Sequence, residues 1–185
     1  MLTREQIVKQ LAASMGKTTV VELSKTLKAQ NFSFRDVIDL TFHPNKQIAF
    51  RTAWLMDTLY FDDPLFYLDD IAYLFQQIPI ITYPASKRHY SRITLNLTSP
   101  KAPKAIQDKL AGIDMEPVVE HFFDWMIDPK VKVAVKVFVA ESIFNLRSRY
   151  PWVSEELANQ IHYMMRNGTA AIQSTGKKLL KELEK

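Results

Sequence analysis

Residues 118 to 146 read VVEHFFDWMIDPKVKVAVKVFVAESIFNL, and this stretch decides the fold class. Its first part repeats apolar residues at the i, i+3, i+4 spacing of one helix face, at Val118, Val119, Phe122, Phe123, Met126 and Ile127. Asp128-Pro129 then ends the pattern, because a proline ring disfavours helical backbone at the residue before it. The stretch therefore predicts an apolar helix followed by a short turn.

The second part of the stretch is ambiguous between helix and strand. Every second residue from Val131 to Val139 is a valine, as in a half-buried strand. We favour a helix, because the proline before the segment and its continuation to Leu146 suit about four helical turns better than a strand of that length. A strand is the alternative.

Helix signals recur along the rest of the chain. Thr3 and Gln6 have the form of a capping box for a helix that runs to about Met15, where Gly16 ends it. Ser33 begins a helix whose apolar face extends to Phe42. Two further helices are expected to begin at Asn45 and at Asp114, and Asp63-Pro64 is expected to begin a helix over 65–78. Four more helices are expected over 18–30, 85–97, 152–166 and 169–184. Residues 80–83 are expected to be extended.

A basic, proline-rich connector covers Ser99 to Lys104. The chain of 185 residues is long enough for one independently stable domain. We therefore expect a single all-helical repeat domain over 1–185, and the connector leaves two halves, 1–99 and 103–185, as the alternative.

Val37–Leu59 and Val118–Leu146 each contain an apolar helix, a short turn with a proline and a second helix. In this they resemble repeats of the HEAT and armadillo kind. The helices that follow the turns align on a final leucine, at Leu59, Leu97, Leu146 and Leu183, with an uneven spacing near ~40 residues. The segment around Pro84 departs most from the pattern.

The resemblance implies an all-α fold, a right-handed HEAT-like α-α superhelix of three to four helix pairs with an N-terminal helical cap. It also implies a role as a binding scaffold, because such pairs stack and present a continuous surface. DNA alkylation-repair glycosylases are built from similar repeats and hold DNA in a basic groove, but no residue motif transfers from them.

Composition narrows the function classes. The chain has no Cys, which removes disulfides, thiolate metal ligands and cysteine nucleophiles and suits a reducing compartment. The N-terminus has no signal-peptide pattern, and no apolar run approaches the ~18 residues of a membrane span. We expect a cytoplasmic protein with no membrane association.

Catalytic and metal-binding motifs are not found in the sequence. The four histidines lack metal-pair spacing, and Glu120-His121 lacks the second histidine of a zincin helix. The acidic residues near Asp62 and Asp69 are better explained by helix N-termini than by cation binding. We therefore predict no catalytic residue, metal or cofactor, and leave open an active site assembled from distant residues.

Basic residues are the only candidate binding feature whose positions along the helices suggest one shared surface. The net charge is +4, and several Lys and Arg side chains fall on the second helices of the expected pairs, which commonly line the concave surface of stacked repeats. An ordinary solvated surface is the alternative. The candidates are Arg51, Lys87, Arg88, Arg92, Lys132, Lys136 and Lys177.

Two functions follow from these observations. The first is a non-enzymatic binding or scaffold module whose helical-repeat surface binds a protein partner. The alternative is a protein that binds nucleic acid or another polyanion through a basic concave groove, with a relationship to the alkylation-repair glycosylases.

The alternative predicts a steep salt dependence of binding to duplex DNA. The logarithmic slope should grow by about 0.9 for each phosphate neutralised, because counterions are released. Reversing Arg88 and Lys136 to Glu should weaken binding whatever the DNA sequence and leave thermal stability nearly unchanged. Fluorescence anisotropy across a salt series measures this slope for the wild type and for the double variant. Equal binding by the two proteins would exclude the basic residues as the site.

Overall fold

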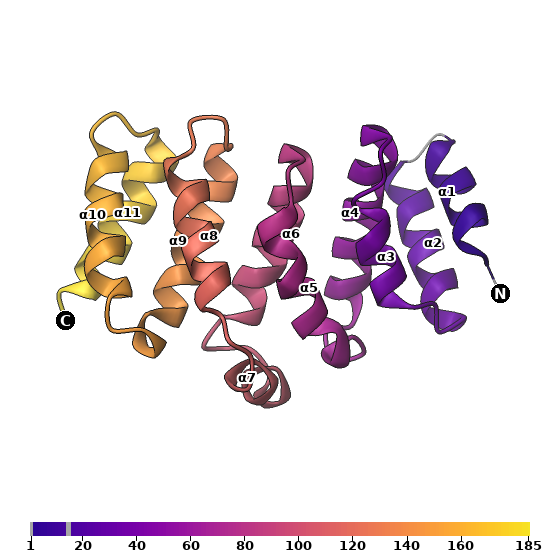
Figure 1. The fold of residues 1–185 in the computed structure, drawn as a ribbon, viewed down its shortest axis with the longest axis horizontal. Helices are drawn as coiled ribbons and strands as arrows, with labels where there is room; N and C mark the ends of the chain where they lie inside the picture. The colour runs from indigo at the N-terminus through magenta and orange to yellow at the C-terminus, as the bar shows by residue number, and fades with distance from the viewer. Residues whose placement is uncertain (1, 14–15) are drawn as a thin grey trace. The chain divides into compact units, whose positions relative to one another are not determined.

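A computed structural model describes residues 2–13 and 16–185, and all regular structure in these residues is helical. The chain divides into two compact units, Met1–Ile93 and Thr94–Lys185, with the boundary inside one helix (Figure 1). The all-α prediction is confirmed. The predicted end of the first helix at Met15 lies outside the described residues.

The described residues of the first unit form five complete helices and the first part of a sixth. They are α1 (Arg4–Ala12), α2 (Lys17–Ala29), α3 (Phe34–Leu40), α4 (Lys46–Asp62), α5 (Ile71–Gln77) and the first part of α6 (Pro84–Leu97). Short 3-10 turns at Leu68–Asp70 and Ile78–Ile80 flank α5.

The second unit begins in the last turn of α6. Its helices are α7 (Lys104–Ala111), α8 (Glu116–Ile127), α9 (Val133–Leu146), α10 (Val153–Met165) and α11 (Ala170–Leu183), with a 3-10 turn at Arg147–Arg149. Figure 1 shows α8 to α11 side by side, with α7 set apart from them at one end of the unit.

Three helix starts have the caps that the sequence predicts, and the end of α2 has an addition. Thr3 and Gln6 form both bonds of the capping box, and the side chains of Ser33 and Asn45 accept backbone N–H bonds at the starts of α3 and α4. The addition is Asn31, whose φ of 50° lets Phe32 N–H reach the carbonyl of Leu27 at 2.9 Å. This closes the end of α2 in a Schellman arrangement without glycine.

Two sequence predictions in the first unit are wrong. Asp63-Pro64 does not begin a helix: Asp63 accepts a bond from Phe66 N–H in a turn, and α5 begins only at Ile71. Phe42 was placed on a buried helix face, yet it is 36% exposed because α3 ends before it.

The helix α7 was missed in the sequence, where its first residue was taken as part of the connector. Ile106 and Leu110 are its buried positions. Its C-terminal end is held by Arg149, which donates to the carbonyl of Leu110 at 3.1 Å and to that of Ile113 at 2.6 Å. An arginine distant in sequence thus satisfies carbonyls that the helix itself leaves free.

The core of the first unit forms around α4, which packs against α1, α2 and α3. Leu55 and Met56 of α4 are fully buried. The hydroxyls of Thr41 and Tyr90 lie 2.8 Å apart in this core. Tyr67 stacks on Phe34 with ring centroids 4.3 Å apart, and burial raises the pKa of Tyr67 to about 12.

The core of the second unit forms between α8 and α9 and continues to α10 and α11. Val135 and Val139 are buried inside α9, so the helical reading of this segment is confirmed. Gly176 of α11 is buried against α10, where an added Cβ would lie 3.1 Å from Ile161 Cγ2. Trp125 of α8 is 2% exposed and packs on Phe122.

The two tryptophans of the second unit provide a matched test of its core. Trp125→Ala should lower the free energy of unfolding by about 3–5 kcal/mol, because it removes a buried large aromatic. Trp152→Ala should cost about 1 kcal/mol or less, because the ring is 37% exposed. Chemical denaturation measures both, and similar losses in the two variants would contradict this description of the core.

Candidate functional site

The structure places four of the predicted basic residues in the first unit, and the first of them, Arg51, has an internal role. The guanidinium of Arg51 on α4 donates to the carbonyls of Leu11 at 2.6 Å and Ala12 at 3.2 Å, and also to that of Ala13. These are the free carbonyls at the end of α1. Arg51 is therefore a helix cap that joins α1 to α4.

A second predicted residue, Arg92, is also engaged within the unit. It donates to Asp57 Oδ2 at 2.6 Å and lies over the ring of Phe61, 4.0 Å from the centroid. The carboxylate of Asp57 is 8% exposed, and His89 Nδ1 lies 3.6 Å from its other oxygen. The cluster holds α4 and α6 together by charge and stacking.

The remaining candidates differ in exposure. Arg88 is exposed on α6, and Lys87 beside it is half-buried. In the second unit Lys132 and Lys177 are exposed at α9 and α11, whereas burial lowers the pKa of Lys136, against the opposing field of Asp128. The two units each hold part of the predicted set, and its role as a binding site stays a prediction.

Three of the acidic residues in this region are paired with basic side chains, and Asp62 lies at the end of α4 and not at a helix N-terminus as predicted. Lys28 lies 2.8 Å from Asp62 and 3.2 Å from Asp63, which raises the pKa of Lys28, and Arg35 lies 2.8 Å from Asp70. No cluster of three or more His, Asp or Glu side chains suited to a metal ion occurs in the described part of the chain. These pairs support a structural role.

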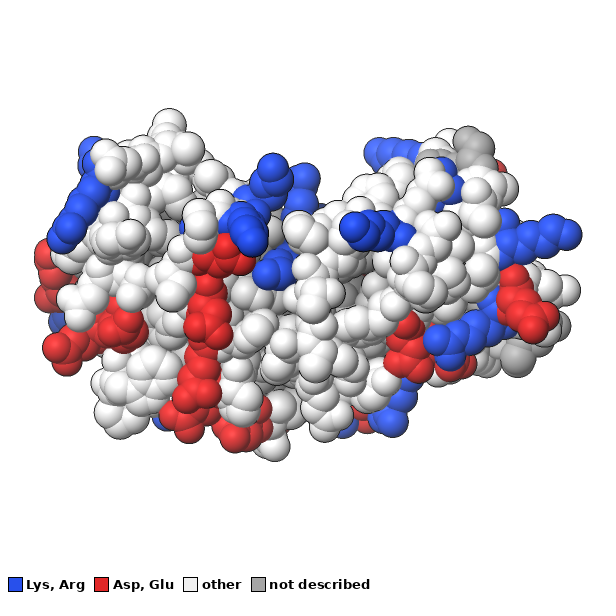
Figure 2. All heavy atoms as spheres, turned by 45° about the horizontal axis from the view of Figure 1, so that its top comes forward, with Lys and Arg blue, Asp and Glu red and all other residues white. Residues whose placement is uncertain are grey.

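A different surface emerges on α8 of the second unit. Glu116, Glu120, Asp124 and Asp128 recur every four residues and therefore lie along one side of this helix. Glu120 and Asp124 are exposed. Figure 2 shows a continuous column of acidic side chains on the surface of this unit, although the whole chain carries a net charge of +4.

Apolar side chains adjoin this acidic row. Ile127, one turn beyond Phe123, is 51% exposed, and Trp152 at the start of α10 is 37% exposed. The Trp152 ring packs on Phe123 with centroids 5.6 Å apart, and its Nε1–H donates to Glu116 Oε1 at 2.9 Å. The indole is thus held in one orientation with much of its surface in water.

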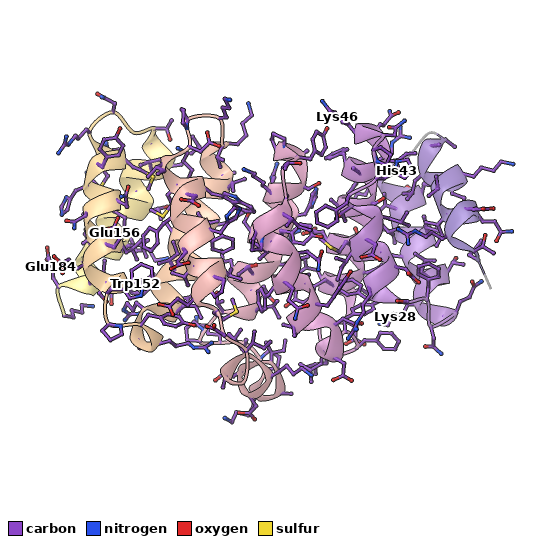
Figure 3. The ribbon with its side chains drawn as sticks, in the orientation of Figure 1. Lys28, His43, Lys46, Trp152, Glu156 and Glu184 are labelled. Atoms are coloured by element: carbon purple, nitrogen blue, oxygen red, sulfur yellow. The ribbon has the colours of Figure 1, made fainter. Side chains whose placement is uncertain are left out.

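Glu156 continues the negative charge onto α10. It lies one turn after Trp152, and Figure 3 shows both residues in the first turns of this helix. Its Oε1 accepts a bond from Gln160 at 2.8 Å. We call the set of Glu116, Glu120, Asp124, Ile127, Trp152 and Glu156 the acidic–aromatic surface.

Sequence reasoning missed this surface, although part of its signal was visible. The four-residue spacing of the acids can be read directly from residues 116 to 128. The sequence placed Ile127 on an apolar helix face and residue 152 at the start of a helix, and only the position of α10 against α8 decides how much of each side chain remains exposed.

Comparison with known proteins defines the class. The model of the HEAT repeat domain matches residues 7–183, nearly the whole chain. Together with the paired helices of each unit, this match shows that the chain belongs to the HEAT repeat family. HEAT repeats commonly serve as protein-interaction scaffolds. No curated protein and no solved structure gave a match.

Among the described residues, none of the helices combines the length and the apolar character that crossing a membrane requires.

Substitution distinguishes a basic residue with a structural role from one that is only exposed. Arg51→Ala should lower the free energy of unfolding by about 1–2 kcal/mol, because three carbonyls at the end of α1 lose a charged donor. Arg88→Ala, on an exposed position of the same unit, should change it by less than about 0.5 kcal/mol. Urea denaturation of both variants tests the difference, and an unchanged midpoint for Arg51→Ala would rule out the capping role.

Proposed function

We propose that this protein is a non-enzymatic binding module of the cytoplasm whose acidic–aromatic surface binds a protein partner. The observation that carries the proposal is the exposure of Trp152 and Ile127 beside a row of carboxylates on α8. The cytoplasmic location is supported by the absence of cysteine from the sequence.

Energetics favour this surface as a contact for protein. Tryptophan is enriched among the residues that dominate binding energy, because its large ring buries much apolar area. Here Phe123 and Glu116 already hold the ring, so little side-chain freedom remains to be lost on binding. Ile127, at the end of the neighbouring helix α8, adds a second apolar contact point.

Charge defines the chemistry of the partner. Complementary potentials speed association and select among partners. The carboxylates of Glu120, Asp124 and Glu156 would attract Lys and Arg, whereas Trp152 and Ile127 require apolar side chains. The partner that fits is a segment with basic and apolar residues on one face, such as a basic amphipathic helix. Phosphate groups of nucleic acid would be repelled here.

A designed peptide tests the proposal directly. A synthetic helix of about 14 residues, with Leu at i, i+3, i+4 and i+7 and Lys elsewhere, should bind the wild-type protein, and a Leu/Glu helix of the same pattern should not. Trp152→Ala should weaken binding of the Leu/Lys helix about tenfold or more, as should the pair Glu120→Lys and Asp124→Lys. Isothermal titration calorimetry measures each Kd.

Matched controls separate the surface from general charge attraction. Glu22→Lys, at an exposed position of α2 in the first unit, changes the charge without touching the surface and should leave the Kd unchanged apart from a small electrostatic effect. Equal affinity of wild type and Trp152→Ala, or an equal loss in Glu22→Lys and Glu120→Lys, would show that the surface is not the binding site.

A further inference from the structure

Acidic residues are missing from two stretches of the first unit that meet in the structure. No Asp or Glu occurs over 40–56 or over 71–93, and both stretches contain Lys and Arg. The first stretch includes most of α4 and the second includes α6 up to the unit boundary. They lie beside each other, because the rings of Phe50 and His89 have centroids 6.1 Å apart.

One face of α4 carries aromatic side chains after a basic one. Lys46, Phe50, Trp54 and Phe61 follow spacings of four and seven residues, which place them along the same side of the helix. Lys46 is exposed and Phe50 is 39% exposed, whereas Trp54 and Phe61 are half-buried. Figure 3 shows Lys46 at the end of the unit where α4 begins. Phe50 and Trp54 are about 6 Å apart along the helix axis.

Cationic side chains of α6 lie against this face. Arg92 lies over the ring of Phe61, 4.0 Å from its centroid, and His89 is the neighbour of Phe50. Arg88 comes one turn before Arg92 on the same side of α6 and is exposed. We call the set of Lys46, Phe50, Trp54, Phe61, Arg88 and Arg92 the basic–aromatic surface.

The basic–aromatic surface stays positive after its internal pairing. Asp57, on the same side of α4, is 2.6 Å from Arg92 and neutralises it. The side chain of Asp57 is 8% exposed, whereas that of Arg92 is 48% exposed. Neither Lys46 nor Arg88 forms an ion pair within the described part of the chain. Two cations therefore remain to attract an anionic partner.

The combination of rings and cations selects among anionic partners. Single-stranded nucleic acid is held by aromatic side chains on which bases stack and by basic groups that follow its phosphates. Arg next to a ring adds cation–π attraction to stacked groups. In a duplex the faces of the bases are already covered by their neighbours, and a chain of carboxylates has no ring to place on Phe50. The partner that uses both kinds of side chain is a single strand.

We propose that the basic–aromatic surface binds single-stranded nucleic acid, with bases stacked on Phe50 and Trp54 and phosphates at Lys46 and Arg88. The binding is independent of base sequence, because every base has a face that can stack. All residues of the surface belong to the first unit, so this activity is separate from protein binding at the acidic–aromatic surface of the second unit.

Four polyanions test the proposal with the full chain. The first is a fluorescein-labelled oligo(dT) of about 12 nucleotides, within the length that one stacking surface covers. The others are an abasic strand of the same length, the corresponding duplex and poly-glutamate. Fluorescence anisotropy at about 50 mM salt should show binding of oligo(dT), and each of the other three should displace it with at least about fivefold lower affinity.

A substitution on α4 tests stacking without a change of charge. Phe50→Leu keeps an apolar side chain but removes the ring, so it should weaken binding of oligo(dT) about fivefold or more and leave binding of the abasic strand unchanged. Phe66→Leu is the matched control, because Phe66 is a 47% exposed ring of the same unit outside the basic–aromatic surface. It should bind both strands as the wild type does.

Substitution of the two cations tests the phosphate contacts. Lys46→Gln and Arg88→Gln should each weaken binding of oligo(dT) and lower the logarithmic salt slope by about 0.7, the value for one phosphate of a single strand. Lys25→Gln, at an exposed position of α2, should leave the slope unchanged. Circular dichroism of each variant checks that the helices are retained.

Four results would overturn the proposal. They are no binding of oligo(dT) at low salt, equal binding of oligo(dT) and the abasic strand, unchanged binding by Phe50→Leu, and binding of the duplex as tight as that of oligo(dT). Tighter binding of poly-glutamate would also overturn it and would assign the surface to an acidic protein segment. None of these results bears on binding of the Leu/Lys helix at the second unit, so the two proposals fail separately.

Discussion

Both units depend on the burial of apolar side chains between packed helices. Isolated helices shorter than about 12–15 residues are marginal in water, and α3 and α5 have seven residues each. Their stability must come from apolar faces such as Phe34 and Leu74, which are buried against other helices of the unit. Ile127 and Trp152 belong to the minority of large apolar side chains that remain exposed among the described residues, together with others such as Phe66, Ile80 and Tyr163.

Local signals predicted most of the fold. The capping groups at Thr3, Ser33 and Asn45 are where the sequence placed them, because a cap depends only on residues within one turn. The valines of 131–139 alternate as in a strand, yet the segment is helical, because packing against α8 and α10 outweighs the intrinsic preference of valine. The helix α7 was missed since its end is stabilised by Arg149, far along the sequence. The turn after Asp63 was misread because Asp63-Pro64 resembles a helix start, whereas Asp63 instead accepts the N–H of Phe66 in a turn.

The candidate sites show what a sequence alone does not contain. Arg51 and Arg88 look alike in a list of basic residues, but one binds three backbone carbonyls and the other is exposed. The acidic row on α8 was readable from its spacing, whereas the exposure of Trp152 depends on how α10 meets α8.

The arginine caps also set an order of events during synthesis of the chain. The carbonyls at the end of α1 are completed by Arg51, 38 to 40 residues later, and the carbonyl of Leu110 at the end of α7 by Arg149, 39 residues later. At about 5–20 residues per second, a ribosome needs roughly 2–8 s to add that length, whereas a helix forms and melts within about a microsecond. On a nascent chain α1 and α7 therefore fluctuate many times before their caps emerge. Each cap can form only after the segment that carries its arginine has left the exit tunnel.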